Sequence, residues 1–79
     1  MKATVLVRPK QGILDPQGEA VESSLRQLGF SVGAARVGRV VDLEVQSDDP
    51  QAARDEVERM CKHLLANPLI ESYEITLDE

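Results

Sequence analysis

Few side chains in this sequence are of types that do chemistry on their own. The one cysteine, Cys61, and the one histidine, His63, lie two positions apart in a stretch with helical periodicity. Residues two apart on a helix do not face each other, so we do not expect a thiol–imidazole pair. Cys61 falls among apolar positions, which favours a small core residue over a nucleophile, and His63 is placed to interact with a helix end. Two soft ligands are too few for a zinc site, and the glycines match no phosphate-binding loop. We therefore expect no catalytic, cofactor-binding or metal site in this chain.

Four cations form the next group of interest, and they flank the ends of two expected strands. On a chain whose formal net charge is −5, they could form a positive spot, or they could be separate cations in water. The residues alone leave both interpretations open and slightly favour the second. The four are Arg8, Lys10, Arg36 and Arg39.

The stretch from Lys10 to Gly18 organises the first half of the chain. Asp15 can cap a helix, because its carboxylate can accept a hydrogen bond from an amide of the first turn. Pro16 suits the first helical position, where its missing N–H costs nothing. Gly18 follows in the first turn, although glycine inside a helix costs about 0.5–1 kcal/mol relative to alanine. This choice indicates either an ordinary helix start or a need for bare backbone, for close packing or for a partner.

Size and composition restrict the possible functions. A chain of 79 residues predicts a single domain over residues 1–79 with a small core, and a lone cysteine allows no internal disulfide, so we expect the chain to associate with copies of itself. The acidic balance argues weakly against nucleic acid or an anionic membrane as the partner. Phe30 and Tyr73 are too few aromatic residues for a base-stacking platform. With no signal-peptide pattern and no apolar run of membrane-spanning length, we expect a cytoplasmic protein.

The periodicity predicts alternating strands and helices in the order strand, helix, strand, strand, helix, strand. This is the order of an α+β, ferredoxin-like fold, with a four-stranded antiparallel sheet and both helices on one face. Gly38 is the expected turn residue between the two middle strands, with the positive φ of a primed hairpin turn. The expected elements are strand 2–8, helix 16–28, strands 31–37 and 41–46, helix 50 to 65 or 66, and strand 69–77.

Each helix carries an apolar stripe that we expect to pack against the sheet. The stripes are Ala20, Val21, Ser24, Leu25 and Leu28 on the first helix, and Ala53, Val57, Met60, Cys61, Leu64 and Leu65 on the second. The opposite sheet face is expected to be partly apolar and to meet water or a second subunit. It would hold Thr4, Leu6, Val40, Asp42 and Glu44.

Three groups of residues resemble a known family, the PurS subunit of phosphoribosylformylglycinamidine (FGAM) synthase. The resemblance covers nearly the whole chain, and its first and last groups are the specific ones. The first is Val7, Arg8, Pro9 and Lys10 followed by Gly12, Ile13, Leu14, Asp15, Pro16, Gln17 and Gly18. The second is Leu28, Gly29 and Phe30 with Arg36, Val37, Gly38 and Arg39, where lysine would be more usual at the last position. The third runs from Met60 to Tyr73 and includes Cys61, Leu64, Leu65, Ala66, Asn67, Pro68, Ile70 and Glu71.

The resemblance implies a role in de novo purine biosynthesis. In that family the small subunit has no catalytic residues, forms homodimers or tetramers, and bridges a glutaminase subunit and a large synthetase subunit. The assembled enzyme uses ATP, Mg²⁺ and glutamine to convert formylglycinamide ribonucleotide (FGAR) to FGAM. The implied role of this chain is to support assembly and ammonia transfer, as a ligase subunit with no cofactor of its own.

We expect the contact with the other subunits on three segments and two flanking cations. The segments are Lys10 to Gly18, the turn from Arg36 to Arg39, and the corner from Asn67 to Glu71. The residues expected to bind partners are Arg8, Lys10, Leu14, Asp15, Pro16, Gly18, Arg36, Arg39, Asn67, Pro68 and Glu71.

Two other functions fit the same element order. An amino-acid-binding regulatory domain of the ACT type would bind its ligand near the first strand-to-helix loop, where Gly12 and Gly18 could suit it. A small stand-alone enzyme is disfavoured, because no acid–base pair is visible. Fold alone does not separate these functions, since one fold hosts many activities.

Overall fold

The computed structural model describes residues 1–78 as an α+β protein with two helices and a three-stranded sheet. The sheet order is β2-β1-β3, and both neighbours pair antiparallel with the central strand β1. Val5 at the middle of β1 lies opposite Val41 on β2 and Ile75 on β3. The elements are β1 (Lys2–Pro9), α1 (Pro16–Gln27), β2 (Arg39–Glu44), α2 (Pro50–Met60), the π-helical turn η1 (Cys61–Leu65) and β3 (Glu71–Asp78).

The core lies between one face of this sheet and α2. Alternation along β1 directs Ala3, Val5 and Val7 to this face, where all three are buried. Val57 and Cys61 from the helical side are completely buried against them. Eight residues form the buried cluster, and none is larger than valine: Ala3, Val5, Val7, Val45, Ala53, Val57, Cys61 and Ala66. This is a small core for a chain of this length.

The other sheet face is open, as the alternation predicts. Leu6 on β1 lies opposite Val40 on β2, and the positions around them are polar or charged. Thr4 donates a hydrogen bond through its hydroxyl to Asp42, with 3.1 Å between the oxygens. Glu44 lies opposite Lys2 at the end of the same face.

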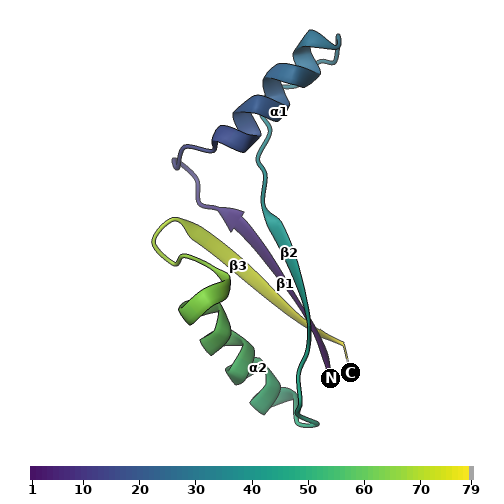
Figure 1. Ribbon diagram of the computed structural model, residues 1–79, viewed down its shortest axis with the longest axis vertical. Helices are drawn as coiled ribbons and strands as arrows, with labels where there is room; N and C mark the ends of the chain where they lie inside the picture. The colour runs from purple at the N-terminus through teal and green to yellow at the C-terminus, as the bar shows by residue number, and fades with distance from the viewer. Residues whose placement is uncertain (79) are drawn as a thin grey trace.

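Helix α1 does not pack on the sheet, so the prediction that both helices cover one face is wrong. The helix extends beyond the end of the sheet at which β1 ends and β2 begins (Figure 1). The molecule is consequently long and thin, with principal extents of 49 × 25 × 14 Å. Val21 and Leu28, which were expected in the core, are exposed, and Leu25 is half-buried. On the second helical stripe, Leu64 is exposed as well.

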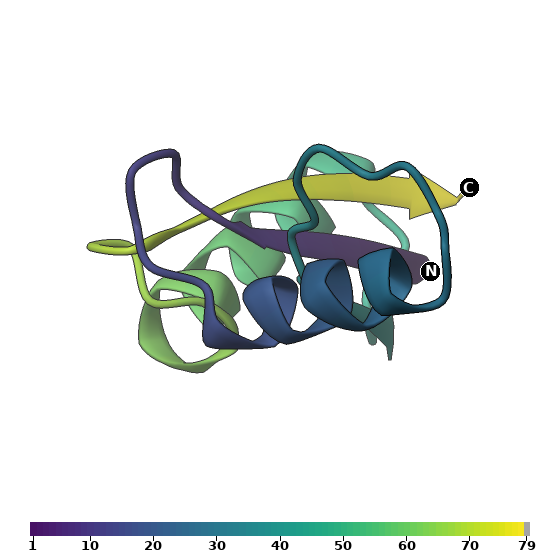
Figure 2. The ribbon, with the colours of Figure 1, turned by 90° about the horizontal axis from the view of Figure 1, so that it is seen from above.

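Residues 31–38 form no strand, so the expected four-stranded sheet is wrong for this chain. The segment runs back along α1 toward the sheet and enters β2 at Arg39 (Figure 2). It contains Gly33, Ala34 and Ala35, whose small side chains offer little for a neighbouring strand to pack against. Gly38 does not have the positive φ of a hairpin turn, because no hairpin is made there.

The helix ends follow the sequence signals. Asp15 and Asp49 cap α1 and α2, and a proline occupies the first turn of each helix. Gly29 ends α1 in the left-handed region at φ 94°, and Phe30 N–H donates to the Leu25 carbonyl oxygen at 3.0 Å. The second helix continues to Leu65, but its last turn is π-helical. None of the helices in the described part of the chain is long and apolar enough to cross a bilayer.

Candidate functional site

The three segments predicted to bind partners meet at one end of the sheet, at the base of α1. We call this region the corner and define it as residues 10–18, 36–39 and 67–71. Figure 1 shows that these segments are where α1, β2 and the loop before β3 converge. The sequence separations are large, and direct hydrogen bonds join the first segment to each of the other two.

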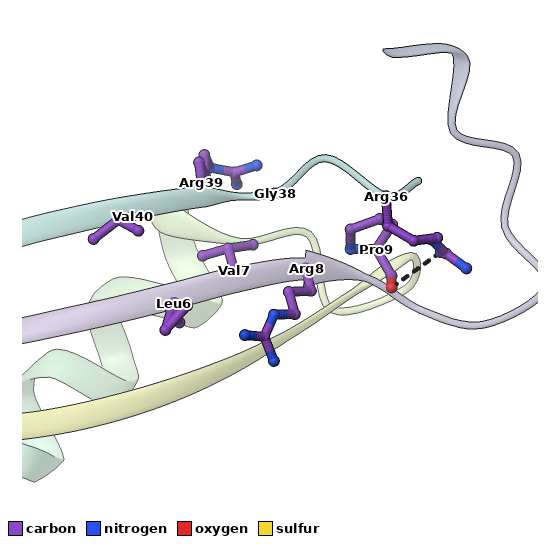
Figure 3. Close-up of a pocket in the computed structure, with 8 residues that line it drawn as sticks. All are labelled: Leu6, Val7, Arg8, Pro9, Arg36, Gly38, Arg39 and Val40. Carbon is purple, nitrogen blue, oxygen red and sulfur yellow. Dashed lines mark hydrogen bonds between the residues drawn. The ribbon is translucent and has the colours of Figure 1, made fainter. Parts of the chain in front are cut away.

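Lys10 connects the first segment to the third. Its backbone N–H donates to the carbonyl oxygen of Ile70 at 2.9 Å, and its Nζ donates to the carbonyl oxygen of Pro68 at 2.7 Å. Arg36 connects the second segment to the first, because its Nη2 donates to the carbonyl oxygens of Lys10 at 2.7 Å and Pro9 at 3.2 Å (Figure 3). Both cations are therefore held by carbonyl groups and keep their charge at the surface.

Asp15 clamps the two chain segments that lead into and out of α1. One carboxylate oxygen, Oδ1, accepts from the Gly18 N–H at 3.0 Å, and the other, Oδ2, accepts from the Val37 N–H at 2.8 Å. The hydrogen bonds from Val37 and then from Gly18 lower the pKa of Asp15, and the nearby charge of Arg36 acts in the same direction. The predicted cap is confirmed, and the same side chain also fixes the return segment.

Gly18 and Gly38 are required at the corner by close approach of the backbone. A Cβ on Gly18 would lie within 3.0 Å of the Ala35 carbonyl oxygen and of the Asp15 carboxylate. A Cβ on Gly38 would lie within 3.0 Å of the Val7 carbonyl oxygen. The sequence left two interpretations of Gly18, an ordinary helix start or a need for bare backbone. The structure favours the second, and close packing within the chain explains it.

A bidentate ion pair joins the second and third segments. Arg39 Nη1 and Nη2 lie 2.6 and 3.0 Å from the two carboxylate oxygens of Glu71, and Nη2 also donates to the Leu65 carbonyl oxygen. The Arg39 side chain lowers the pKa of Glu71, and Glu71 in turn raises that of Arg39. Glu71 accepts a further bond from the Asn67 N–H at 2.7 Å, which fixes the loop before β3. Asn67 itself accepts the Leu69 N–H at 3.1 Å.

Arg8 is the one predicted site residue that lies apart from the corner. It is on the open face of the sheet, whereas Arg39 is on the face that α2 covers (Figure 3). A shallow hollow of about 280 Å³ at its strand end is lined by Arg8, Arg36 and Arg39, with Leu6 and Val40 as part of its apolar lining. Three of the four cations therefore border one hollow, although Arg39 is paired with Glu71 and Arg8 lies on the other sheet face.

The corner also exposes apolar side chains. Leu14 and Ile70 line a hollow of about 220 Å³ together with Asp15 and Glu71. Leu14, Leu69 and Ile70 are all exposed, and Leu69 keeps 83% of its surface accessible. Exposed apolar side chains bordered by charged groups are typical of a protein–protein contact surface.

The arrangement of the titratable groups offers no reaction centre in residues 1–78. Cys61 is completely buried, and burial, with Glu58 nearby, raises the pKa of its thiol, which opposes a nucleophilic role. His63 is exposed on η1. Across the described residues, no three His, Cys, Asp or Glu side chains are placed to hold a metal ion.

Several groups at the corner were not identifiable from side-chain patterns. The Val37 N–H and the carbonyl oxygens of Pro9, Leu65 and Ile70 all complete its hydrogen bonds. These are main-chain groups, which every residue carries, so the sequence holds no signal for them. Only the tertiary approach of the three segments reveals them.

Comparisons with known proteins assign the chain to a family. The fold and the corner define a small α+β protein whose notable features are contact surfaces. A family model described as "PurS: Phosphoribosylformylglycinamidine (FGAM) synthase" matches residues 2–79, so the chain belongs to this family. The family resemblance expected from the sequence motifs is confirmed.

Curated relatives and solved structures agree with this assignment. The PurS subunit of Methanocaldococcus jannaschii is 38% identical over 79 residues, covering 99% of this chain and 95% of the relative. The crystal structure of that protein superposes with a TM-score of 0.85. A chain in the structure of PurLQS from Thermotoga maritima is 34% identical, with a TM-score of 0.86 over 95% of this chain and 93% of that one. These matches do not favour an ACT-like regulatory domain.

Proposed function

We propose that this chain is the non-catalytic small subunit of an FGAM synthase complex, bridging a glutaminase subunit and a large synthetase subunit. Membership of the PurS family over residues 2–79 carries the proposal. The similar chain from Thermotoga maritima was solved in a structure described as PurLQS, which supports an assembly with two further subunits. The complex would act in the cytoplasm and use ATP and Mg²⁺, with no cofactor bound by this chain alone.

The chemistry of ammonia gives such a subunit a purpose. Ammonia released from glutamine is protonated readily in water, and the ammonium ion has no lone pair with which to attack. A passage that excludes water between the two active sites keeps the nucleophile reactive. A small subunit contributes to that passage by packing at the junction and by fixing the relative position of its neighbours.

We place the partner contact at the corner, with Arg8 at its border. The hydrogen bonds of Lys10, Asp15 and Arg39 hold the backbone there in one conformation, so little conformational entropy is lost on binding. Leu14 and Leu69 supply exposed apolar surface that a partner can cover. Lys10 and Arg36 supply charge at the edge of that surface, where it guides association more than it adds affinity.

Reconstitution with the two other subunits tests the function. The chain is mixed with the glutaminase and synthetase from the same source, with ATP, Mg²⁺ and either glutamine or ammonium chloride, and FGAM formation is measured. We expect glutamine-dependent activity to require the chain and ammonia-dependent activity to proceed without it. Equal rates with and without the chain, for both nitrogen donors, would refute the bridging role.

Substitutions at the corner test its placement. Leu69→Asp and Lys10→Ala are expected to weaken assembly and to reduce glutamine-dependent activity while ammonia-dependent activity stays unchanged. Arg8→Ala is expected to act in the same direction. The matched control is Arg54→Ala, which removes an exposed cation from the middle of α2 and is expected to leave both activities unchanged. If the corner variants assemble as well as Arg54→Ala, the contact lies elsewhere on the molecule.

A further inference from the structure

The open face of the sheet has an acidic end and a basic end. Where β1 begins, the residues opposite its outward positions include three carboxylates, with one lysine among them: Asp42, Glu44 and Asp78. Where β1 ends, Arg8 is the charged residue of this face, and it lies opposite the neutral Ser72 on β3. The basic end is notable because the formal net charge of the chain is −5.

Arg8 has no carboxylate of its own chain to neutralise it. Within residues 1–78, neither an ion pair nor a hydrogen bond engages its guanidinium group, and the residue is exposed. Glu74 on the same face lies opposite Leu6, one outward position further along β1, and makes no ion pair with Arg8. A guanidinium group in this state keeps all its N–H donors for a carboxylate, whose two oxygens match their fork geometry.

Apolar surface adjoins this guanidinium group. The hollow of about 280 Å³ at the strand end includes Leu6 and Val40, which lie opposite each other on β1 and β2. Val40 keeps 59% of its surface accessible. Arg36 borders the same hollow, and its Nη2 donates to two main-chain carbonyl oxygens. Its Nε and Nη1 make no hydrogen bond within residues 1–78, so they can still donate to an incoming carboxylate.

The geometry of the hollow does not suit one small anion. Figure 3 shows the guanidinium groups of Arg8 and Arg36 pointing away from each other, with Pro9 between them. The volume, about 280 Å³, is below the range of about 300–1,000 Å³ that is typical of small-molecule pockets. The nearby N-terminus of α1 is already occupied, because the Asp15 carboxylate accepts from the Gly18 N–H. A phosphate group would therefore lack the main-chain donors that usually help to bind it.

We propose that this hollow receives an acidic segment of a partner subunit, in which one apolar side chain is flanked by two carboxylates. The apolar side chain would cover Leu6 and Val40, and the carboxylates would pair separately with Arg8 and Arg36. The segment would belong to one of the two larger subunits, so the proposal rests on the proposed function. Charge complementarity favours this occupant, because the basic end of the face attracts the segment while the acidic end repels it.

Binding to the separate subunits is the first test. The dissociation constant of the chain with the glutaminase and with the synthetase is measured at low and at high salt. For one of the two, Arg8→Glu is expected to raise the constant by about tenfold or more and to reduce its dependence on salt, because like charges then face each other. Arg8→Lys keeps the charge and should retain most of the binding. Arg54→Glu is the matched control, since it reverses an exposed charge on α2.

A second pair of variants tests the apolar part of the hollow. Val40→Asp places a carboxylate where we expect an apolar side chain and an acidic segment, so it should weaken binding to the same subunit by about tenfold. Thr76→Asp adds a carboxylate to the same sheet face outside the hollow, opposite Thr4, and should leave binding unchanged. Thermal melts of both variants verify that the fold is retained.

A peptide titration tests the hollow without any other subunit. Backbone amide resonances of the isolated chain are followed as a capped tripeptide of glutamate, leucine and glutamate is added. We expect shifts at Arg8, Gly38 and Val40 that approach saturation at a few times a dissociation constant of about 1 mM and that decrease with added salt. The peptide with glutamine in place of both glutamates should cause no such shifts, and inorganic phosphate alone should not reproduce them.

The outcomes separate this proposal from the proposed function. If the wild-type chain binds the subunits and Arg8→Glu binds as well as Arg54→Glu does, the bridging role stands and the acidic segment is refuted. Absence of peptide-induced shifts at the hollow refutes it too, and equal shifts with inorganic phosphate would show a small-anion site instead. If the wild-type chain binds neither subunit, the proposed function fails, and the peptide titration alone decides the chemistry of the hollow.

Discussion

Adding one methyl group to Gly18 tests whether the corner is as tightly closed as described. The new Cβ would lie within 3.0 Å of the Ala35 carbonyl oxygen and of the Asp15 carboxylate. A backbone oxygen cannot move away alone, so residues 35–37 would have to shift, and the Val37 N–H bond to Asp15 would lengthen. The substitution perturbs the base of α1 and no other part of the molecule.

The expected change in the free energy of unfolding is the balance of a helix-propensity gain and a packing loss. Alanine favours the helix by at most about 1 kcal/mol over glycine. Overpacking costs about 1–3 kcal/mol, and lengthening the hydrogen bond from the Val37 N–H to Asp15 adds to this cost. We therefore expect Gly18→Ala to destabilise the protein by about 1–3 kcal/mol, which lowers the melting temperature by at least about 5 °C in a domain of this size.

Thermal unfolding followed by circular dichroism at one fixed protein concentration measures this effect, because association makes the melting temperature depend on concentration. The control is Gly33→Ala. Gly33 has open space around its Cβ position and a backbone outside the left-handed region, so alanine should stabilise by about 0.4–1 kcal/mol there. If Gly18→Ala melts at or above the temperature of Gly33→Ala, the account of the corner is wrong.

Three further predictions concern the corner and the core. Hydrogen bonds from Val37 and Gly18 lower the pKa of Asp15 in the folded state, so its contribution to stability is complete above the ordinary aspartate range, near pH 4, and is lost as the pH falls through the folded-state pKa. Urea unfolding of the wild type and Asp15→Asn should therefore differ most at neutral pH and converge in acid; a difference that grows in acid would contradict the sign. Val57→Ala, in the completely buried part of α2, should cost about 2–3 kcal/mol and lower the urea midpoint with little change in slope, whereas Val40→Ala on the open face should change stability by less than about 0.5 kcal/mol. Glu71→Gln should lower global stability by less than about 1 kcal/mol, because exposed ion pairs contribute little, yet it should speed hydrogen exchange at the Asn67 amide, which the carboxylate now holds; unchanged exchange would show that the carboxylate does not fix this loop.

Local chemistry in the sequence predicted the starts of both helices and the three strands that form the sheet. Asp15 with Pro16, and Asp49 with Pro50, start helices because capping depends on residues within one turn. The alternation in 41–45 and in 72–77 gave the buried face of the sheet, since side-chain direction in a strand has a period of two. These rules act over a few residues and need no knowledge of the rest of the molecule.

The placement of α1 could not be predicted in the same way. An apolar stripe such as Val21, Leu25 and Leu28 shows that a helix buries one face, but it does not show which surface covers that face. Residues 31–37 have too little side-chain volume to indicate a strand or exclude one. Family motifs predicted three partner-binding segments, and the structure brings these segments together. The hydrogen bonds that join them use main-chain groups that no sequence pattern reveals.

The hydrogen bonds of Asp15 fix the base of α1, so a small rotation at the base displaces the far end of the helix by a larger distance. The fixed point is the Asp15 carboxylate, and the 12-residue helix extends about 18 Å from it. A rotation of about 10° at this fixed point would displace the far end by about 3 Å. Side chains packed against that end would have to rearrange. A partner that binds at the corner, as proposed above, would therefore move the far end of α1 through a small change at its base.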